Sequence, residues 1–320
     1  MNGAPEKERI RTLIKMLLPL AATLVVVVTA LLIAKYSAGG GQEPAGAAAN
    51  TQYSGGAATG QQATTAAAPG QLAAPEIRVS AGFFPLSFPS QLPDPPRKLK
   101  VPILMFHHIG DPPPGADRLR RELTVPASDL DAMLGYLKQA GFTPVTETQL
   151  FQALYGSQPL PAKPVMLTFD DGYSDVYEVA RPILEKYGDP ATFYIITDKV
   201  GTPEYMGWEQ IEELGREGMD IGSHTLDHLD LTTLSAASLD NELKGSSQAL
   251  SQRLGHPIYW FCYPSGKVNA VVERALGQSG YLLATTTWNG VHQSSDAPFE
   301  LTRLRMRPET GLAGLKELLQ

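Results

Sequence analysis

The chain has 320 residues, enough for one large domain or two of average size. Charged residues make up only 18% of it and the formal net charge is −7, which argues against nucleic acid or another polyanion as its main partner. Its single cysteine, Cys262, excludes an intrachain disulfide framework and a metal site built from several cysteines.

The beginning of the chain has the pattern of a membrane anchor. Residues 16–34 carry no charge, and at about 1.5 Å rise per residue they nearly span a hydrocarbon core of about 30 Å. Basic residues dominate the N-terminal flank, so we expect the N-terminus in the cytoplasm and everything after Lys35 outside. A cleavable signal peptide ending near residues 36–38 is the alternative, although the apolar run is long for one. Both interpretations export the rest of the chain.

A linker separates this segment from the folded part. Up to about residue 74 the chain is mostly Ala, Gly, Gln and Thr, which cannot bury enough apolar surface to offset the entropy of ordering. A stretch rich in Pro and Phe follows, either as an arm packed on the domain or as a continuation of the linker. We therefore divide the chain into a tail and anchor at 1–36, a flexible linker and arm at 37–96, and a folded domain at 97–320.

From residue 101 onward, predicted strands and helices alternate. Short apolar runs predict strands at 101–106, 165–169, 191–196, 219–223, 259–263, 282–286 and 301–306. Amphipathic stretches predict helices at 128–140, 146–155, 176–187, 208–217, 235–254, 269–279 and 312–319. Repeated βα units favour an α/β fold with a parallel sheet covered by helices, most economically a closed barrel, with an open doubly wound sheet as the alternative. No glycine-rich phosphate loop follows these strands, which disfavours a nucleotide enzyme.

Two predicted strands end in side chains suited to catalysis. The run at 165–173 ends in Asp170, Asp171 and a glycine, and about fifty residues later another strand leads to His224 and His228. In α/β sheets and barrels, catalytic groups lie at such strand ends. An Asp-Gly sequence after a strand, taken alone, is explained equally well by an ordinary turn. Two imidazoles four residues apart together with a carboxylate, however, are the ligand types and number of an open catalytic metal site.

Thr168-Phe169-Asp170-Asp171-Gly172, followed by His224-Thr225-Leu226-Asp227-His228, resembles the polysaccharide deacetylase family, the NodB-like carbohydrate esterases. The resemblance covers about residues 101–307. It implies a distorted (β/α) barrel of about seven units that removes acetyl groups from sugar polymers with a divalent metal, usually Zn²⁺, with Ni²⁺, Co²⁺ or Mn²⁺ as alternatives. It also implies that Asp171, His224 and His228 bind the metal and that Asp170 is the general base. Such a ligand set leaves positions free for water and the acetyl carbonyl.

The third motif departs from the common family pattern. Phe261-Cys262-Tyr263-Pro264-Ser265-Gly266 falls where many members have Arg-x-Pro-Tyr-Gly, so Cys262 stands at the arginine position. We therefore expect the usual charge partner of the base to be missing. The pattern is similar to that of the branch that acts on exopolysaccharide poly-N-acetylglucosamine. The turn at Tyr263, Pro264 and Ser265 is expected to contact substrate, with a backbone N–H, at Ser265, donating to the developing oxyanion.

The last two family motifs are weak in this chain. Trp288 either forms a wall of the acetyl pocket or simply packs. The late Leu-x-x-His is absent, because residues 301–304 offer an arginine instead of a histidine. Leu104-Met105-Phe106-His107 has that spacing at the end of the first strand, which neighbours the last strand in a closed barrel. We therefore predict His107 as the general acid, with His108 as the alternative and structural roles for both still open.

Together these observations favour a single-pass, membrane-anchored enzyme whose catalytic domain lies outside the cytoplasm. It would be a metal-dependent N-deacetylase of a GlcNAc-containing polysaccharide, with exopolysaccharide poly-N-acetylglucosamine favoured over peptidoglycan and chitin. Its partners would be the acetylated polysaccharide, the membrane and envelope proteins of polysaccharide synthesis or export. The alternatives are an O-acetyl esterase on a glycan such as xylan, and a catalytically silent carbohydrate-binding protein on the same fold. The absence of the family arginine at position 262 favours the silent protein.

Overall fold

The computed structural model describes residues 93–320. The predicted anchor and nearly all of the predicted linker and arm lie outside these residues, so they stay predictions. Within the described part of the chain, no helix is long and apolar enough to cross a membrane. Within residues 93–320, the first regular element is β1 (Lys98–Lys100).

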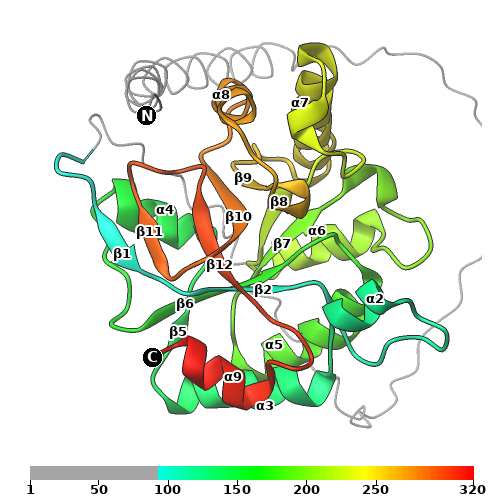
Figure 1. Cartoon of the computed structure of the whole chain (residues 1–320), viewed down its shortest axis with the longest axis vertical. Coiled ribbons are helices and arrows are strands. Elements are labelled where there is room, and N and C mark those ends of the chain that lie inside the picture. The colour runs from blue at the N-terminus through cyan, green and yellow to red at the C-terminus, as the bar shows by residue number, and fades with distance from the viewer. Residues whose placement is uncertain (1–92) are drawn as a thin grey trace, which may run out of the picture. The chain divides into compact units, whose positions relative to one another are not determined.

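A parallel barrel of seven strands forms the centre of residues 93–320 (Figure 1). Going round the barrel, β2 pairs with β12, followed by β10, β9, β8, β7 and β6, and β6 pairs back with β2. This closure confirms the predicted barrel, including the pairing of its first and last strands, and rules out the open sheet. The strands are β2 (Ile103–Phe106), β6 (Pro164–Phe169), β7 (Thr192–Ile195), β8 (Asp220–Ser223), β9 (Trp260–Cys262), β10 (Leu283–Asn289) and β12 (Leu301–Arg305).

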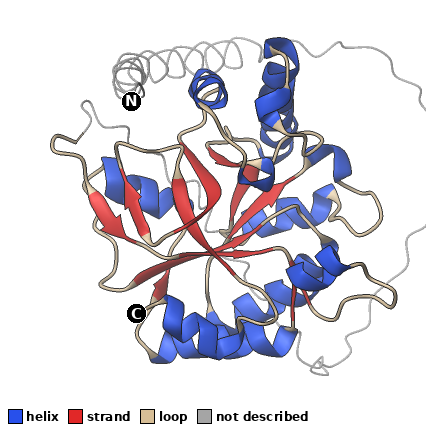
Figure 2. Cartoon of the chain, viewed as in Figure 1, coloured by secondary structure: helices blue, strands red, loops and turns tan. Residues whose placement is uncertain are grey.

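Helices surround the strands, as Figure 2 shows. Several begin at the residues that the sequence indicates: Thr146 caps α4 (Glu147–Tyr155) with a capping box, and Ser235 caps α7 (Ala236–Leu254). The predicted helix at 176–187 is instead a π-helical segment, η1 (Val176–Ala180), followed by α5 (Arg181–Tyr187). Pro182 explains the break, because it has no N–H to donate to the preceding turn. Four more long helices are α3 (Ala127–Gln139), α6 (Trp208–Arg216), α8 (Ala270–Gln278) and α9 (Gly311–Leu318).

The strand alternation divides the apolar residues into two clusters, because successive side chains point to opposite faces. Ile103, Met166 and Leu301 pack together inside the barrel, where side chains of α4 complete the cluster. Leu104 and Leu167 belong to the second cluster, between the strands and the outer helices. The barrel interior is therefore a packed core, and polar side chains collect where the strands end.

The short elements were not predicted from the sequence. They are β1, its antiparallel partner β11 (His292–Ser294), the pair β3 (His108–Ile109) and β4 (Thr124–Val125), the extra strand β5 (Thr143–Pro144) beside β6, and the helix α2 (Arg118–Leu123). Strands of two or three residues are too short to carry a periodic pattern.

Candidate active site

The predicted site residues come together at the carboxyl ends of the barrel strands. Asp170 and Asp171 directly follow β6, His224 follows β8, and His107 follows β2. Asp170, Asp171, His107 and His224 are all at least nine-tenths buried. The strands therefore deliver them to one small region, as in other parallel barrels.

Asp171, His224 and His228 converge on one point. The Oδ1 atom of Asp171 lies 3.2 Å from Nε2 of His224 and 3.6 Å from Nε2 of His228. Asp171 and His228 both have left-handed backbone conformations, with φ of 72° and 62°. Non-glycine residues rarely adopt such values, and they gather at functional sites where the surrounding structure enforces them.

Neighbouring groups fix the orientation of the two histidines. Nδ1 of His224 donates to the carbonyl oxygen of Cys262 at 2.7 Å, which directs Nε2 towards Asp171. The backbone N–H of His228 donates to Oγ1 of Thr225 at 2.9 Å, so Thr225 supports the loop that carries His228. A buried carboxylate that the sequence did not single out, Glu242, accepts from two backbone N–H groups of this loop, at 3.0 and 3.1 Å.

The electrostatics of the three residues suit a cation. Burial opposes the ionisation of Asp171, but the hydrogen bond and charge of His224 outweigh it and lower the pKa of the carboxyl. Burial, together with the neighbouring His224, lowers the pKa of His228 to about 4, so this imidazole is neutral at pH 7. Burial also disfavours the charged form of His224, yet Cys262 and Asp171 raise its pKa well above the ordinary value.

These residues therefore fit a divalent metal. Their ligand atoms lie within 4.8 Å of one another, and they supply one carboxylate and two imidazoles. Metal-binding histidines commonly donate their other ring N–H to a backbone carbonyl in this way, which holds the imidazole in place. The geometry agrees with the ligand set predicted from the sequence.

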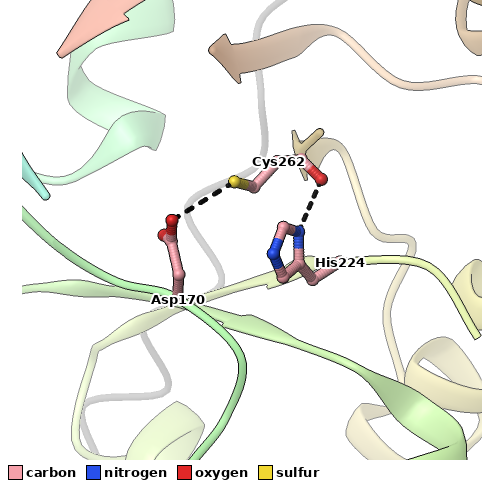
Figure 3. A group of neighbouring side chains, drawn as sticks. All are labelled: Asp170, His224 and Cys262. Atoms are coloured by element: carbon pink, nitrogen blue, oxygen red, sulfur yellow. Dashed lines mark hydrogen bonds between the residues drawn. The ribbon is translucent and has the colours of Figure 1, made fainter. Parts of the chain in front are cut away.

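A second trio, Asp170, His224 and Cys262, also brings possible ligand atoms within 4.8 Å (Figure 3). The thiol of Cys262 lies 3.6 Å from Oδ2 of Asp170. The guanidinium of Arg303, however, lies 3.2 Å from the same sulfur and pairs with Asp170. A cation in this trio would face the positive charge of Arg303, so the trio is the poorer metal site. Cys262 itself is a small buried residue at the end of β9.

Asp170 does have a charge partner, so the prediction that this partner is missing was wrong. Nη1 and Nη2 of Arg303 bind the two carboxylate oxygens at 2.7 and 2.8 Å, a bidentate pair that is almost completely buried. Nε of Arg303 also donates to the carbonyl oxygen of Thr286 at 2.8 Å. Burial opposes the ionisation of Asp170, but Arg303 more than compensates and lowers the pKa of the carboxyl. Asp170 is therefore held as an oriented carboxylate.

His107 lies beside the base. Its Nε2 is 3.8 Å from Oδ2 of Asp170, and its buried Nδ1 has no hydrogen-bond partner among the described residues. Burial lowers the pKa of His107, although the charge of Asp170 opposes this. The alternative, His108, has a different environment: its Nδ1 bonds Asp175 at 2.7 Å and its ring stacks on Tyr173. His107 therefore faces the site, and His108 belongs to a side-chain cluster next to it.

The predicted substrate residues divide into a buried and an exposed group. Tyr263 and Pro264 are buried, and the ring of Tyr263 packs against Phe261, so the Tyr263 side chain cannot contact a glycan. Ser265 is exposed, with φ of 55°, in the turn η4 (Pro264–Gly266). Trp288, near the end of β10, is 45% exposed. Ser265 and Trp288 are thus the members of this set that substrate can reach.

Gly266 fixes the shape of this turn. Its φ is +69°, and a Cβ atom there would lie 2.1 Å from Oγ1 of Thr287. Only glycine avoids both the conformational strain and the clash. The backbone at Ser265 therefore has a defined position beside β10.

Comparison with known proteins identifies relatives of this chain. The family described as polysaccharide deacetylase matches residues 157–284. YxkH of Bacillus subtilis, which bears the name of a polysaccharide deacetylase, is 31% identical over 215 residues, covering 67% of this chain and 74% of that protein. The poly-beta-1,6-N-acetyl-D-glucosamine N-deacetylase of Escherichia coli is 33% identical over 237 residues. That alignment covers 60% of this chain but only 34% of the E. coli protein.

A solved structure shares the fold. The deacetylase PplD of Streptococcus pyogenes, in complex with acetate, superposes with a TM-score of 0.65 at 30% identity. The match covers 70% of this chain and all of the PplD chain.

Proposed function

This chain belongs to the polysaccharide deacetylase family of hydrolases, and from that premise we propose that it is a metal-dependent N-deacetylase of a GlcNAc-containing polysaccharide. The observation that carries the proposal is the pair of adjacent carboxylates with separate partners. Arg303 holds Asp170, while Asp171 faces His224 and His228. One carboxylate is thus available as a base and the other as a ligand.

The reaction consumes water and one acetamido group and yields an amine and acetate. A divalent metal held by Asp171, His224 and His228 would acidify water and polarise the acetyl carbonyl. Asp170 accepts the proton of the attacking water, since Arg303 keeps it ionised and aimed at the site. The backbone N–H at Ser265 is the proposed donor to the developing oxyanion.

His107 is the proposed general acid. An amine is a poor leaving group, so its nitrogen must be protonated as the C–N bond breaks. The unperturbed pKa of an imidazole, about 6.5, makes it suitable for this transfer. Burial holds the pKa of His107 below that value before substrate binds. The imidazole would therefore take up the proton that Asp170 has accepted from water and pass it to the leaving nitrogen. Its Nε2 lies 3.8 Å from Oδ2 of Asp170, which supports this order.

Poly-N-acetylglucosamine is the substrate that we favour, ahead of peptidoglycan and chitin. The support is the Phe261–Gly266 sequence, together with similarity to the E. coli enzyme named for this polymer. An O-acetyl esterase activity on a glycan such as xylan would use the same groups without needing a strong general acid. The Arg303–Asp170 pair counts against a catalytically silent protein, because the base keeps a charge partner.

Acetate release from a panel of defined glycans tests this function. The panel contains oligomers of β-1,6-linked GlcNAc, chitin oligomers, peptidoglycan fragments and O-acetylated xylan, each measured with and without a chelator. We expect the highest kcat/KM on a GlcNAc oligomer and loss of activity with the chelator. Acetate release from xylan alone, or full activity in the chelator, would contradict the proposal.

We also propose that the catalytic domain works outside the cytoplasm, tethered by residues 16–34. The proposal rests on the sequence of that segment and on the charges that flank it. Protease added to intact cells should release the domain by cutting between residues 37 and 74. Cleavage only after permeabilisation would contradict this orientation.

A further inference from the structure

Arg305 lies at the mouth of the site and has no role in the mechanism above. It is the last residue of β12, two positions after Arg303, so the strand alternation directs both side chains to the same face. Its Cα pairs with that of Met105 on β2, the strand that leads to His107. Arg303 binds Asp170 inside the barrel, and Arg305 therefore lies one step closer to the opening.

The side chain of Arg305 has no hydrogen bond or ion pair with any residue between 93 and 320, and it is half-buried. Four other basic side chains on this end of the barrel do have carboxylate partners there. The pairs are Arg303–Asp170 at 2.7 Å, Lys267–Asp230 at 2.7 Å, Arg120–Asp175 at 3.1 Å and Arg307–Glu309 at 3.6 Å. Arg305 thus carries a positive charge that no described carboxylate pairs with directly.

This charge acts on the catalytic groups. Burial lowers the pKa of Arg305, and Arg303 and Arg307 add to the effect while Asp170 opposes it. The charge of Arg305 in turn helps to lower the pKa of His107. An arginine remains protonated at neutral pH even so, because its ordinary pKa is above 12. In a half-buried position its field is screened less than that of a surface charge.

The proposed reaction changes the charge of the polymer. N-acetylglucosamine is neutral, whereas each deacetylation leaves an amine, and amines with pKa values near 8 are largely protonated at neutral pH. Repulsion between two positive charges about 8–12 Å apart, at an effective dielectric constant of about 20, would weaken binding of the sugar by roughly 10- to 30-fold. A glucosamine next to the reacting sugar would meet that penalty at Arg305.

We propose that Arg305 gives the site its charge selectivity, disfavouring glucosamine beside the sugar being deacetylated and favouring neutral neighbours. The inference rests on the proposed N-deacetylase function and deepens it. It makes acetylated stretches the preferred substrate and leads the enzyme to leave a partly deacetylated chain. Arg305 is a specificity-determining residue in this account, because it takes no part in proton transfer.

Two trisaccharides test the proposal. Each has one central GlcNAc, flanked on both sides either by glucose or by glucosamine. Both flanking sugars lack the acetamido group, so the ratio of the two kcat/KM values for acetate release reports mainly the effect of charge. The full chain is compared with Arg305→Gln and Arg305→Lys, and with Arg307→Gln as a control that removes a paired arginine two residues further along.

We expect the wild-type ratio to favour the glucose trisaccharide and to fall roughly 10-fold in Arg305→Gln. Arg305→Lys should keep most of the selectivity, Arg307→Gln should change it less than about twofold, and added salt should reduce it in the wild type. An unchanged ratio in Arg305→Gln would overturn the inference while leaving the proposed function intact. This includes the case in which both kcat/KM values fall by the same factor. If the wild type releases no acetate even from a fully acetylated GlcNAc oligomer, the proposed function fails and the inference fails with it.

Discussion

Arg303 binds both carboxylate oxygens of Asp170, although the two residues are 133 positions apart in the sequence. The last strand of the barrel thus delivers the charge partner of the base across the interior from β6. The neighbouring carboxylate, Asp171, has no part in this pair and faces His224 and His228. This separation of partners is the physical basis for assigning different roles to two adjacent aspartates.

Removing Arg303 should be strongly destabilising. Arg303→Met leaves the buried carboxylate of Asp170 without its partner, and we expect the free energy of unfolding to fall by about 3–5 kcal/mol. The double variant Asp170→Asn/Arg303→Met buries no isolated charge, so it should lose less than the sum of the two single variants. Denaturant unfolding of the four proteins measures this coupling. Strict additivity would mean that the pair contributes nothing to stability.

His107→Ala should impair deacetylation selectively. We expect a loss of about 10²–10⁴ in turnover on an N-acetyl substrate, because the leaving nitrogen is no longer protonated. An activated ester such as nitrophenyl acetate has a good leaving group and should lose much less. Steady-state rates on the two substrates give the comparison.

His108→Ala is the matched control for that experiment. His108 stacks on Tyr173 and bonds Asp175, so its loss should affect both substrates to a similar extent. Equal losses in His107→Ala would point to a structural role for His107. A selective loss in His108→Ala instead would transfer the acid role to that residue.

Metal content distinguishes the two possible trios of ligands. We expect about one divalent ion per chain in the wild type and a large loss of metal in His228→Ala, since His228 belongs only to the trio with Asp171. Cys262→Ala should keep its metal, because the sulfur faces Arg303 rather than the metal position. Elemental analysis after dialysis measures both variants. Metal lost from Cys262→Ala but retained in His228→Ala would reverse the assignment.

Asp189 should make the stability of the domain depend on pH. Burial raises the pKa of this carboxyl to about 6, and its Oδ2 has no hydrogen-bond partner among residues 93–320. A raised carboxyl pKa means that the folded state binds a proton more tightly than the unfolded state. The protonated Asp189 therefore costs the fold nothing below about pH 4, and the free energy of unfolding decreases as the pH rises from about 4 to about 6.

Asp189→Asn should consequently be more stable than the wild type at pH 7, by about 1 kcal/mol after allowance for solvent screening. Below about pH 4 the difference should vanish. Asp131→Asn is the control, because the Asp131 carboxylate is paired with Lys186 at 2.6 Å and should show no such gain. Thermal unfolding between pH 4 and pH 7 tests both variants. A variant no more stable than wild type at pH 7 would contradict the prediction for Asp189.

Much of the fold could be predicted because the long elements have clear local signals. The apolar run before Asp170 and the Ser235 cap of α7 each specify their element within a few residues. The aspartates and histidines of the site could also be identified, because they are close together in two motifs. Glu242 has no such motif, since it meets the His224–His228 loop only through the packing of α7.

The partner of Asp170 could not be identified from the local pattern. Cys262 occupies the position of the family arginine. A comparison of the motif position by position therefore suggests that the charge partner of Asp170 has been lost. The arginine at position 303 was visible, but its side chain reaches Asp170 only because β12 closes the barrel next to β2. Tertiary closure thus replaces a charge that the local motif lacks, and the same closure places His107 beside the base.

The most direct test of the account is to measure metal content and turnover in the same preparation of Asp170→Asn. If Asp170 is the base and Asp171 the ligand, this variant should retain about one divalent ion per chain and lose about 10²–10⁴ in acetate release from a GlcNAc oligomer. Asp171→Asn, the matched variant, should lose metal and activity together. Loss of metal from Asp170→Asn in parallel with its activity, or turnover close to that of the wild type, would contradict the division of roles between the two aspartates.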